Sequence, residues 1–217
     1  MQPRYLVPVA AALMITAVPV LATSQSGPQV PGAQDVSRVS AGTYRTDPLH
    51  TLVGWSVNHF GFNDYYGVFG DAEGVLQIDP ANPAAASVAV TIPITSLAVV
   101  SEGLREHLLR GGKDGAAADF FGPEPAPAIF RSTSVRMDDD DKDEAVITGN
   151  LTLNGVTRPI TIEAEFTGAG ANPMSKKETI GFEGETVIRR SEFGMSALIP
   201  LVADEVELKI SAAFEKQ

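Results

Sequence analysis

Apolar and polar residues alternate along most of the chain from about residue 43 onward, in short runs separated by turn residues. We expect these runs to be β-strands, because alternation places every second side chain on the same face of a sheet. They span residues 49–60, 75–79, 87–94, 129–137, 145–153, 156–167, 179–190 and 205–214. Several short strands at this spacing predict an all-β sandwich or barrel.

The strongest local signal is the pair Asn154-Gly155, which lies between two alternating runs. Such a pair predicts a two-residue hairpin turn, because both residues adopt positive φ at little steric cost. The register of this hairpin places four opposed pairs on one apolar face: Leu153 with Val156, Leu151 with Arg158, Gly149 with Ile160, and Ile147 with Ile162. Arg158 is the single charge on that face, so its side chain either extends to solvent at the end of the sheet or meets an anionic group.

Residues 96–121 form the one long excursion without a strand pattern. Within it, Leu97, Val100, Leu104 and Leu108 fit the spacing of a helical stripe over residues 96–110. A long connection in a compact domain is usually functional or disordered. We therefore keep two interpretations: a plug or lid over one end of a barrel, or a helix that simply covers that end.

The first 22 residues have the features of a secretory signal peptide: a basic start, a short apolar stretch and small residues before a plausible cleavage site. Residues 23–42 are rich in Ser, Gln, Gly and Pro and are expected to be a flexible lead-in. The folded domain is then expected over residues 43–217. A cleaved signal peptide predicts a periplasmic protein.

Composition excludes several classes of function. The chain has no cysteine, so disulfides, thiol nucleophiles and thiolate metal sites are absent. Its formal charge is −11 and its isoelectric point about 4.6, which argues against a nucleic-acid partner, since binding to a phosphate backbone requires a concentrated basic surface.

Catalytic and metal-binding motifs are weak. His50 and His59 are separated by an odd number of positions, so on one regular strand they face opposite sides and do not share a metal ion. No Gly-x-Ser-x-Gly motif and no phosphate-binding glycine loop occurs. The acidic run 138–144 lacks the spacing of a calcium loop and is interpreted as a solvated turn between two strands.

Several motifs, taken together and in order, resemble the YceI-like family of bacterial periplasmic polyisoprenoid-binding proteins. The resemblance covers about residues 43–214, nearly all of the expected mature chain. It rests on Asp47-Pro-Leu-His50, Val53-x-Trp-x-Val-x-His59, Gly67-x-Phe69, Phe120-Phe121, the segment 149–159 around the hairpin, and Arg190-Ser-Glu-Phe-Gly194. Thr51, Ala72 and the stretch 111–118 depart from the family pattern.

The resemblance implies an eight-stranded antiparallel β-barrel similar to lipocalins, with an elongated apolar cavity for a quinone or polyprenyl lipid. A barrel of eight strands either fills with side chains or holds one small ligand, and periodicity alone does not choose between these cases. From strand parity we expect the cavity lining to include Val53, Trp55, Val57, Phe69, Leu151, Ile160 and Ile162. His59 and Arg158 are candidate head-group contacts.

The leading hypothesis is therefore a periplasmic carrier of an isoprenoid lipid, with no other cofactor and no metal. Two alternatives remain open: a barrel enzyme that acts on a small amphipathic substrate with His59 as acid or base, and a ligand-free interaction barrel filled by side chains. The lipid is the expected partner. A transient membrane or membrane-redox partner and a homodimer are left open.

Overall fold

The structure is a computed structural model that describes residues 30–217. The expected signal peptide and the first part of the lead-in, residues 23–29, lie outside the described residues. Within residues 30–217, no helix is long and apolar enough to cross a membrane.

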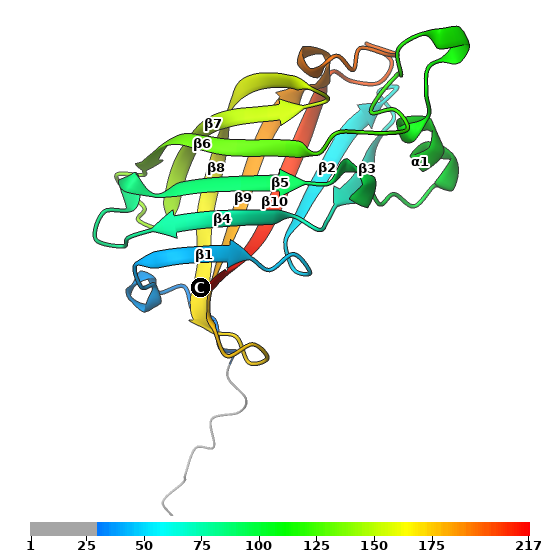
Figure 1. The fold of residues 1–217 in the computed structure, drawn as a ribbon. Coiled ribbons are helices and arrows are strands. Elements are labelled where there is room, and N and C mark those ends of the chain that lie inside the picture. The colour runs from blue at the N-terminus through cyan, green and yellow to red at the C-terminus, as the bar shows by residue number, and fades with distance from the viewer. Residues whose placement is uncertain (1–29) are drawn as a thin grey trace, which may run out of the picture.

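Ten antiparallel strands account for most of the fold (Figure 1). They are β1 (Gly42–Thr46), β2 (Leu52–His59), β3 (Asn63–Phe69), β4 (Glu73–Ile78), β5 (Ser87–Ile92), β6 (Ala128–Met137), β7 (Glu144–Leu153), β8 (Val156–Ala171), β9 (Glu178–Arg189) and β10 (Glu205–Lys216). The described residues contain one α-helix, α1 (Glu102–Leu109), and five short 3-10 turns: Val36–Arg38, Pro83–Ala85, Ile94–Ser96, Lys113–Gly115 and Arg190–Phe193.

Eight of these strands close into a ring in the order β1-β4-β5-β6-β7-β8-β9-β10, and β1 pairs back onto β10. The predicted eight-stranded antiparallel barrel is confirmed. One edge of β10 is shared between two partners, since β1 pairs with its last residues and β2 pairs with residues 207–211. The hairpin β2–β3 therefore extends the wall on one side, beyond the point where β1 ends.

The sequence pattern missed β1 and β3. β1 is a short strand of five residues that follows a polar lead-in, and β3 carries mostly exposed polar and aromatic residues. Neither strand has a long apolar alternation that would identify it in the sequence. Both are held in place by tertiary pairing, β1 with β4 and β10, and β3 with β2. The sequence pattern thus identified eight strands but included β2 in place of the ring strand β1.

The β7–β8 hairpin has the predicted register. Asn154 and Gly155 have φ of 50° and 76°, and Leu153 is opposite Val156, Leu151 opposite Arg158, and Ile147 opposite Ile162. Positive φ at both turn residues is the geometry that a two-residue hairpin requires. Leu151, Leu153 and Ile162 are buried, so this face of the hairpin is directed into the barrel.

The excursion between β5 and β6 contains a shorter helix than expected. α1 begins at Glu102, because the Ser101 hydroxyl caps it by accepting from the backbone N–H of Leu104. Leu97 and Leu108 are buried, but Val100 precedes the helix and is fully exposed, so the predicted stripe over residues 96–110 is wrong at that position. Figure 1 shows α1 at one end of the barrel, beside β2 and β3.

The described part of the lead-in, residues 30–41, lies against the barrel instead of extending away from it. Ala33 forms a β-bridge with Ala169 of β8, and the Ser40 hydroxyl and amide both donate to the Glu178 carboxylate of β9. This segment has no apolar periodicity that would predict its position. Backbone hydrogen bonds between Ala33 and Ala169 of β8 hold it against the barrel. Whether the lead-in is flexible stays a prediction.

Candidate functional site

The barrel encloses two apolar chambers that lie end to end. The first, here called the ring-end chamber, has a volume of about 560 Å³ and lies beside β1, β4 and β5. Apolar residues make most of its wall, including Leu76, Val88, Phe166 and Phe214. Five charged residues also line it. Four belong to the β6–β7 turn and one to β9: Asp138, Asp139, Lys142, Asp143 and Glu183.

The second, here called the helix-end chamber, has a volume of about 390 Å³ and lies beneath α1. Strands β2, β3, β5, β6, β7, β9 and β10 supply one part of its wall, and α1 with the loops around it supplies the rest. Its lining residues with polar side-chain atoms are Trp55, His59, Tyr65, Ser101, His107 and Arg190.

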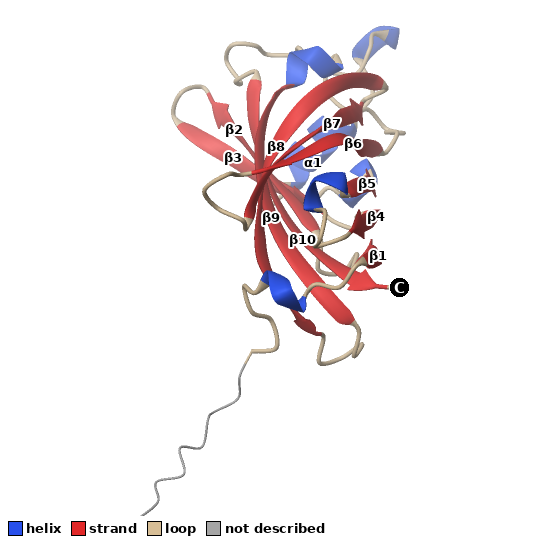
Figure 2. Ribbon diagram, turned by 90° about the vertical axis from the view of Figure 1, so that its left-hand side faces the viewer, coloured by secondary structure: helices blue, strands red, loops and turns tan. Residues whose placement is uncertain are grey.

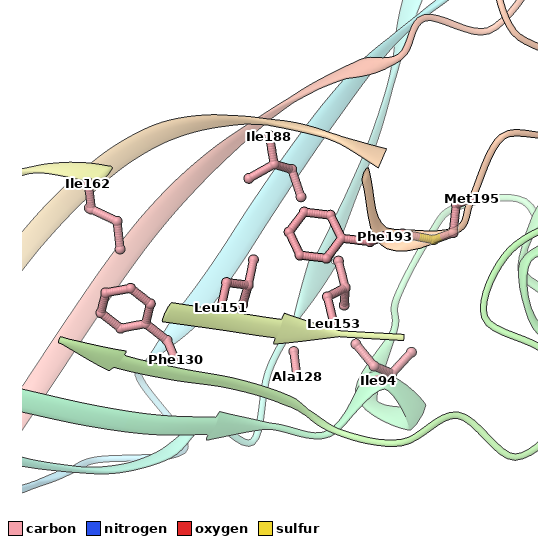
Figure 3. Close-up of a cluster of buried hydrophobic side chains, with 9 residues drawn as sticks. All are labelled: Ile94, Ala128, Phe130, Leu151, Leu153, Ile162, Ile188, Phe193 and Met195. Carbon is pink, nitrogen blue, oxygen red and sulfur yellow. The ribbon is translucent and has the colours of Figure 1, made fainter. Parts of the chain in front are cut away.

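The two chambers meet at Val53 and Ile92, which line both. A cluster of buried side chains surrounds this junction, with Phe130 and Leu151 opposite each other on β6 and β7. Figure 3 shows Phe130 and Ile162 on one side of the cluster and Leu153, Phe193 and Met195 on the other. A linear apolar ligand that occupied both chambers would pass this junction.

Two glycines keep the interior hollow by letting aromatic rings lie flat against the wall. A Cβ atom on Gly149 would lie 2.4 Å from Cζ of Phe130, and a Cβ atom on Gly67 would lie 2.3 Å from Cζ2 of Trp55. Either contact is far inside van der Waals distance, so any side chain there would push the ring away. The absence of Cβ at Gly149 and Gly67 therefore gives the large rings a place along the wall, outside the centre of the chambers.

The Trp55 indole lines the helix-end chamber, and its Nε1 is buried with no hydrogen-bond partner among the described residues. A buried donor without a partner costs free energy, so such positions are uncommon. The ring is held by its contact with Gly67, its partner on β3. Trp55 therefore contributes to the wall by packing and not by a hydrogen bond from its indole.

Arg190 organises the end of the helix-end chamber. It is 4% exposed, and its guanidinium donates to the carbonyl oxygens of Met195, Val202 and Ala203 at 2.6, 2.8 and 2.8 Å. Burial lowers the pKa of Arg190, and the charge of nearby Asp204 opposes that shift. The side chain thus fixes the connection between β9 and β10. The guanidinium carbon Cζ of Arg190 also lies over the Phe120 ring, 5.6 Å from its centroid.

The structure brings seven of the nine predicted site residues to the chambers. Val53, Trp55, Val57, His59, Phe69 and Leu151 line the helix-end chamber, and Val53 and Ile162 line the ring-end chamber. Binding of a ligand by these residues stays a prediction. They come together because β2, β3, β7 and β8 direct one parity of side chains inward.

Arg158 and Ile160 lie elsewhere. Arg158 is exposed and lines neither chamber, and its Nη1 lies 3.5 Å from the carbonyl oxygen of the adjacent Thr157. The side chain extends to solvent, as the first of the two interpretations for this charge expects. Ile160 is partly buried and lines a hollow on the outside of the barrel, because the first half of β8 has left the wall formed with β9.

Sequence reasoning missed most of the lining that comes from loops and from α1. Leu104, His107, Leu108, Phe121 and Met195 line the helix-end chamber, yet none belongs to a strand. Strand parity has no bearing on such residues. The missed strand residues of the ring-end chamber, such as Val88, Val90 and Phe130, do follow an alternation that could have identified them.

The chambers contain little that resembles catalytic machinery. The His59 ring stacks on Phe60 at 3.9 Å between centroids and meets Tyr65 edge-on at 4.9 Å, and within residues 30–217 no carboxylate lies at ion-pair distance from it. Among the same residues, no cluster of His, Asp and Glu could hold a metal ion. Residues 138–143 of the acidic run form the β6–β7 turn, in which Asp138 accepts from the amides of Asp140 and Asp141, and Glu144 begins β7.

A closed antiparallel barrel with an apolar interior and a partly polar end belongs to the class of hollow binding barrels. Comparison with known proteins specifies this class further. The YceI-like domain model matches residues 44–214, and Protein YceI of Escherichia coli O17:K52:H18 is 39% identical over 174 residues, which cover 79% of this chain and 85% of that protein. The chain therefore belongs to the YceI-like family.

Two solved structures share the fold. BcnA of Burkholderia cenocepacia matches with a TM-score of 0.63 at 23% identity, over 77% of this chain and 98% of BcnA. A polyisoprenoid binding domain from Saccharophagus degradans matches with a TM-score of 0.52 at 12% identity, over 82% of this chain and all of that domain. Both support the barrel architecture.

Proposed function

We propose that this protein is a periplasmic carrier of a long-chain isoprenoid lipid, of the quinone or polyprenyl type. The single observation that carries the proposal is the pair of apolar chambers that meet at Val53 and Ile92 inside a closed barrel. Their shape suits a ligand that is long, narrow and apolar. The description of the Saccharophagus degradans domain as polyisoprenoid-binding supports the same class of ligand.

The energetics favour such a ligand. Each methylene-sized group that leaves water for an apolar chamber contributes about 0.8 kcal/mol. Ligand pockets in proteins typically measure about 300–1,000 Å³, and the chambers, at about 560 and 390 Å³, each fall in that range. Several prenyl units would therefore supply most of the affinity, and the protein needs few polar contacts to hold the lipid.

The proposed orientation places the tail in the ring-end chamber and the head group in the helix-end chamber. The polar atoms of His59, Ser101 and His107 line the helix-end chamber, whereas the acidic β6–β7 turn lies at the other. His59 remains the candidate head-group contact. Arg158 is not carried into this proposal, because its side chain is exposed outside both chambers.

The two chambers also bear on the alternatives. A ligand-free barrel filled by its own side chains would lack cavities of this size. For an enzyme, the acid or base would be His59, whose described neighbours are aromatic rings with no orienting carboxylate. Turnover of a candidate lipid that is lost in His59→Ala would favour the enzyme over the carrier.

Native mass spectrometry of protein purified gently from its own periplasm tests the ligand directly. We expect a bound mass that organic extraction identifies as a prenyl lipid. A protein that is consistently empty, and that also fails to take up added quinone or polyprenol, contradicts the proposal. Detection in the cytoplasmic fraction alone contradicts the periplasmic part of it.

A matched pair of variants on β2 tests whether the lipid occupies the chambers. Val57 lines the helix-end chamber, whereas the adjacent Ser56 lies on the other face, and its hydroxyl donates to Glu207. Val57→Lys buries a charge in the apolar chamber and should abolish binding of decylubiquinone. Ser56→Lys, placed opposite Glu207, should leave binding within about two-fold of the unmodified chain.

A further inference from the structure

The wall of the barrel is incomplete between β8 and β9. β8 pairs with β7 over its whole first half, down to Val156 opposite Leu153. Its pairing with β9 ends at Glu163 opposite Glu185, although β9 continues to pair with β10 as far as Arg189. Figure 1 shows the first half of β8 arching away from β9. This gap is here called the seam.

The sequence explains why the strands separate there. In the β7–β8 hairpin, Val156, Arg158 and Ile160 direct their backbone groups to β7, so the backbone groups of Pro159 and Thr161 face β9. Pro159 has no N–H to donate, which prevents regular pairing at that position. On one face of the sheet, the last two opposed pairs before the seam are Glu163 with Glu185 and Glu165 with Glu183. Like charges directly opposite each other weaken a sheet.

A hollow of about 840 Å³ lies on the outside of the barrel along the seam. Most of its lining residues are polar or charged, among them Thr161, Glu163, Glu185, Arg189 and Lys209. Its apolar part includes Val187, Ile188, Phe193 and Leu208. Ile188 and Leu208 line the helix-end chamber as well. The hollow and the chamber are thus separated by a single layer of side chains.

Phe193 packs against this layer on the side of the hollow. It is 1% exposed, lines the hollow and packs in the cluster with Leu153 and Ile188 (Figure 3). It does not belong to a strand but to the 3-10 turn Arg190–Phe193, and the Asn154 side chain at the hairpin tip donates to its carbonyl oxygen at 3.2 Å. Between β9 and β8, the Thr186 hydroxyl donates to the carbonyl oxygen of Thr161 at 2.7 Å.

We propose that the seam is a side portal through which an apolar chain enters and leaves the helix-end chamber, with Phe193 as its gate and Asn154 as the latch. The proposal rests on the proposed function, since it concerns the route of the same lipid. Displacement of Phe193 breaks one side-chain hydrogen bond and no strand pairing, because the ladder between β8 and β9 is already absent there.

The two ends of the barrel are less suited to this passage. At one end, α1 and the connection held by Arg190 cover the helix-end chamber, and moving Arg190 leaves three carbonyl groups without their donor. At the other end, the acidic turn 138–143 borders the ring-end chamber. At the seam, by contrast, a single layer of apolar side chains separates the helix-end chamber from the hollow, and the charged residues of the hollow lie on its outer side.

Stopped-flow fluorescence measures the passage directly. Trp55 is the only tryptophan of the chain and lines the helix-end chamber, so quenching by decylubiquinone reports arrival of the quinone. The chain has no cysteine, so a single introduced thiol can be labelled cleanly. Val187→Cys, 56% exposed in the wild-type chain and on the wall of the hollow, is labelled with a polyethylene-glycol maleimide to cover the seam.

We expect the label at Val187→Cys to slow association and dissociation by about five-fold or more, with the equilibrium affinity changed little, because a gate alters rates and not the bound state. The same label on Ser134→Cys, exposed on β6 and away from the seam, is the matched control. Asn154→Gly removes the latch but keeps a turn that suits a hairpin, and should speed both rates.

The outcomes separate the two proposals. Equilibrium binding with rates that neither the Val187→Cys label nor Asn154→Gly changes overturns the portal and leaves the carrier intact. Equal slowing by the labels at Val187→Cys and Ser134→Cys also overturns the portal. No equilibrium quenching in the unmodified chain overturns the proposed function, and the portal with it.

Discussion

The two ends of the barrel are built in different ways. At the ring end, β1 pairs with both β4 and β10, and Tyr44, Ile180 and Phe214 pack into a cluster of their own. At the helix end, β8 and β9 separate, and α1 with the β9–β10 connection completes the wall. In Figure 2, which is turned by 90° from Figure 1, α1 lies on the far side of the strands.

This difference shows two ways of enclosing a cavity. A regular ladder spreads its stabilisation over many backbone hydrogen bonds, so no single residue closes the ring end. The helix end depends on individual side chains: Arg190 holds a connection, Phe193 closes the seam and Ser101 caps α1. Regions with few ladder contacts open at lower free energy than the core of a sheet. We therefore expect function that needs motion to be located at the helix end.

The largest effect is expected from Arg190→Met. The substitution leaves the carbonyl oxygens of Met195, Val202 and Ala203 without their donor, so the free energy of unfolding should fall by about 3 kcal/mol or more. Urea denaturation of the full chain measures it. Arg189→Met is the control, because the Arg189 side chain is 61% exposed and, among residues 30–217, forms its ion pair with the surface carboxylate of Glu205. Equal losses in both variants would contradict the role of Arg190.

A second effect concerns the hollow interior itself. In Gly149→Ala, the new methyl group would meet both the Phe130 ring and the carbonyl oxygen of Arg131, at 2.4 and 2.6 Å. We expect a loss of about 2 kcal/mol of stability, because the ring must move into the chamber, and weaker binding of long-chain lipids.

Gly103→Ala in α1 serves as the matched control for Gly149→Ala. A Cβ atom on Gly103 would have only the Ser101 hydroxyl within 4 Å, at 3.9 Å, and alanine in a helix is more stable than glycine by about 1 kcal/mol. Adding Phe130→Leu to Gly149→Ala should recover part of the lost stability. If the double variant is no more stable than Gly149→Ala alone, the clash with the ring is not the cause.

The same contrast between the ends explains how far the sequence could be interpreted. The alternation on β5, β6, β7 and β10 and the Asn154-Gly155 turn predicted strands, one register and an inward face, because these properties depend on local spacing. The inward parity of β2 then brought Val53, Trp55, Val57 and His59 together in one chamber. Strand parity is thus sufficient where the wall is a regular ladder.

Parity was insufficient where the wall is irregular. It assigned Ile160 and Arg158 to the interior, but Pro159 and the opposed glutamates separate this part of β8 from β9, and both residues lie at or beyond the seam. It also gave no information on Met195 or His107, which reach the chamber from loops and α1. Their positions depend on tertiary contacts, which have no period in the sequence.

A third, smaller effect is expected at α1. Ser101→Ala removes the hydroxyl that accepts from the Leu104 amide, and loss of such a cap typically costs about 1 kcal/mol. Hydrogen exchange should become faster in residues 102–109 and remain unchanged in β4 and β5. Ser134→Ala on β6 is the control, since its side chain is exposed. Uniformly faster exchange across the barrel would show that the two ends are not independent.

The smallest effect tests the ring end by pH. The Glu178 carboxylate accepts hydrogen bonds from Ser40 and Tyr44 and lies 3.7 Å from the ammonium group of Lys216. Burial alone would raise the pKa of Glu178, but the hydrogen bonds and the Lys216 charge outweigh it and hold this pKa below its usual value of 4.5.

Because the pKa is lower in the folded state, the ionised carboxylate stabilises the fold above pH 4.5, and this stabilisation is lost as the pH falls through the folded-state pKa. Glu178→Gln should therefore be less stable than the unmodified chain near neutral pH, by less than about 1 kcal/mol, and the difference should shrink in acid. Urea midpoints measured across that range provide the test. In Glu183→Gln, also on β9, the lost charge faces Glu165, so neutralisation should instead stabilise near neutral pH; a difference for Glu178→Gln that grows in acid would refute the assignment.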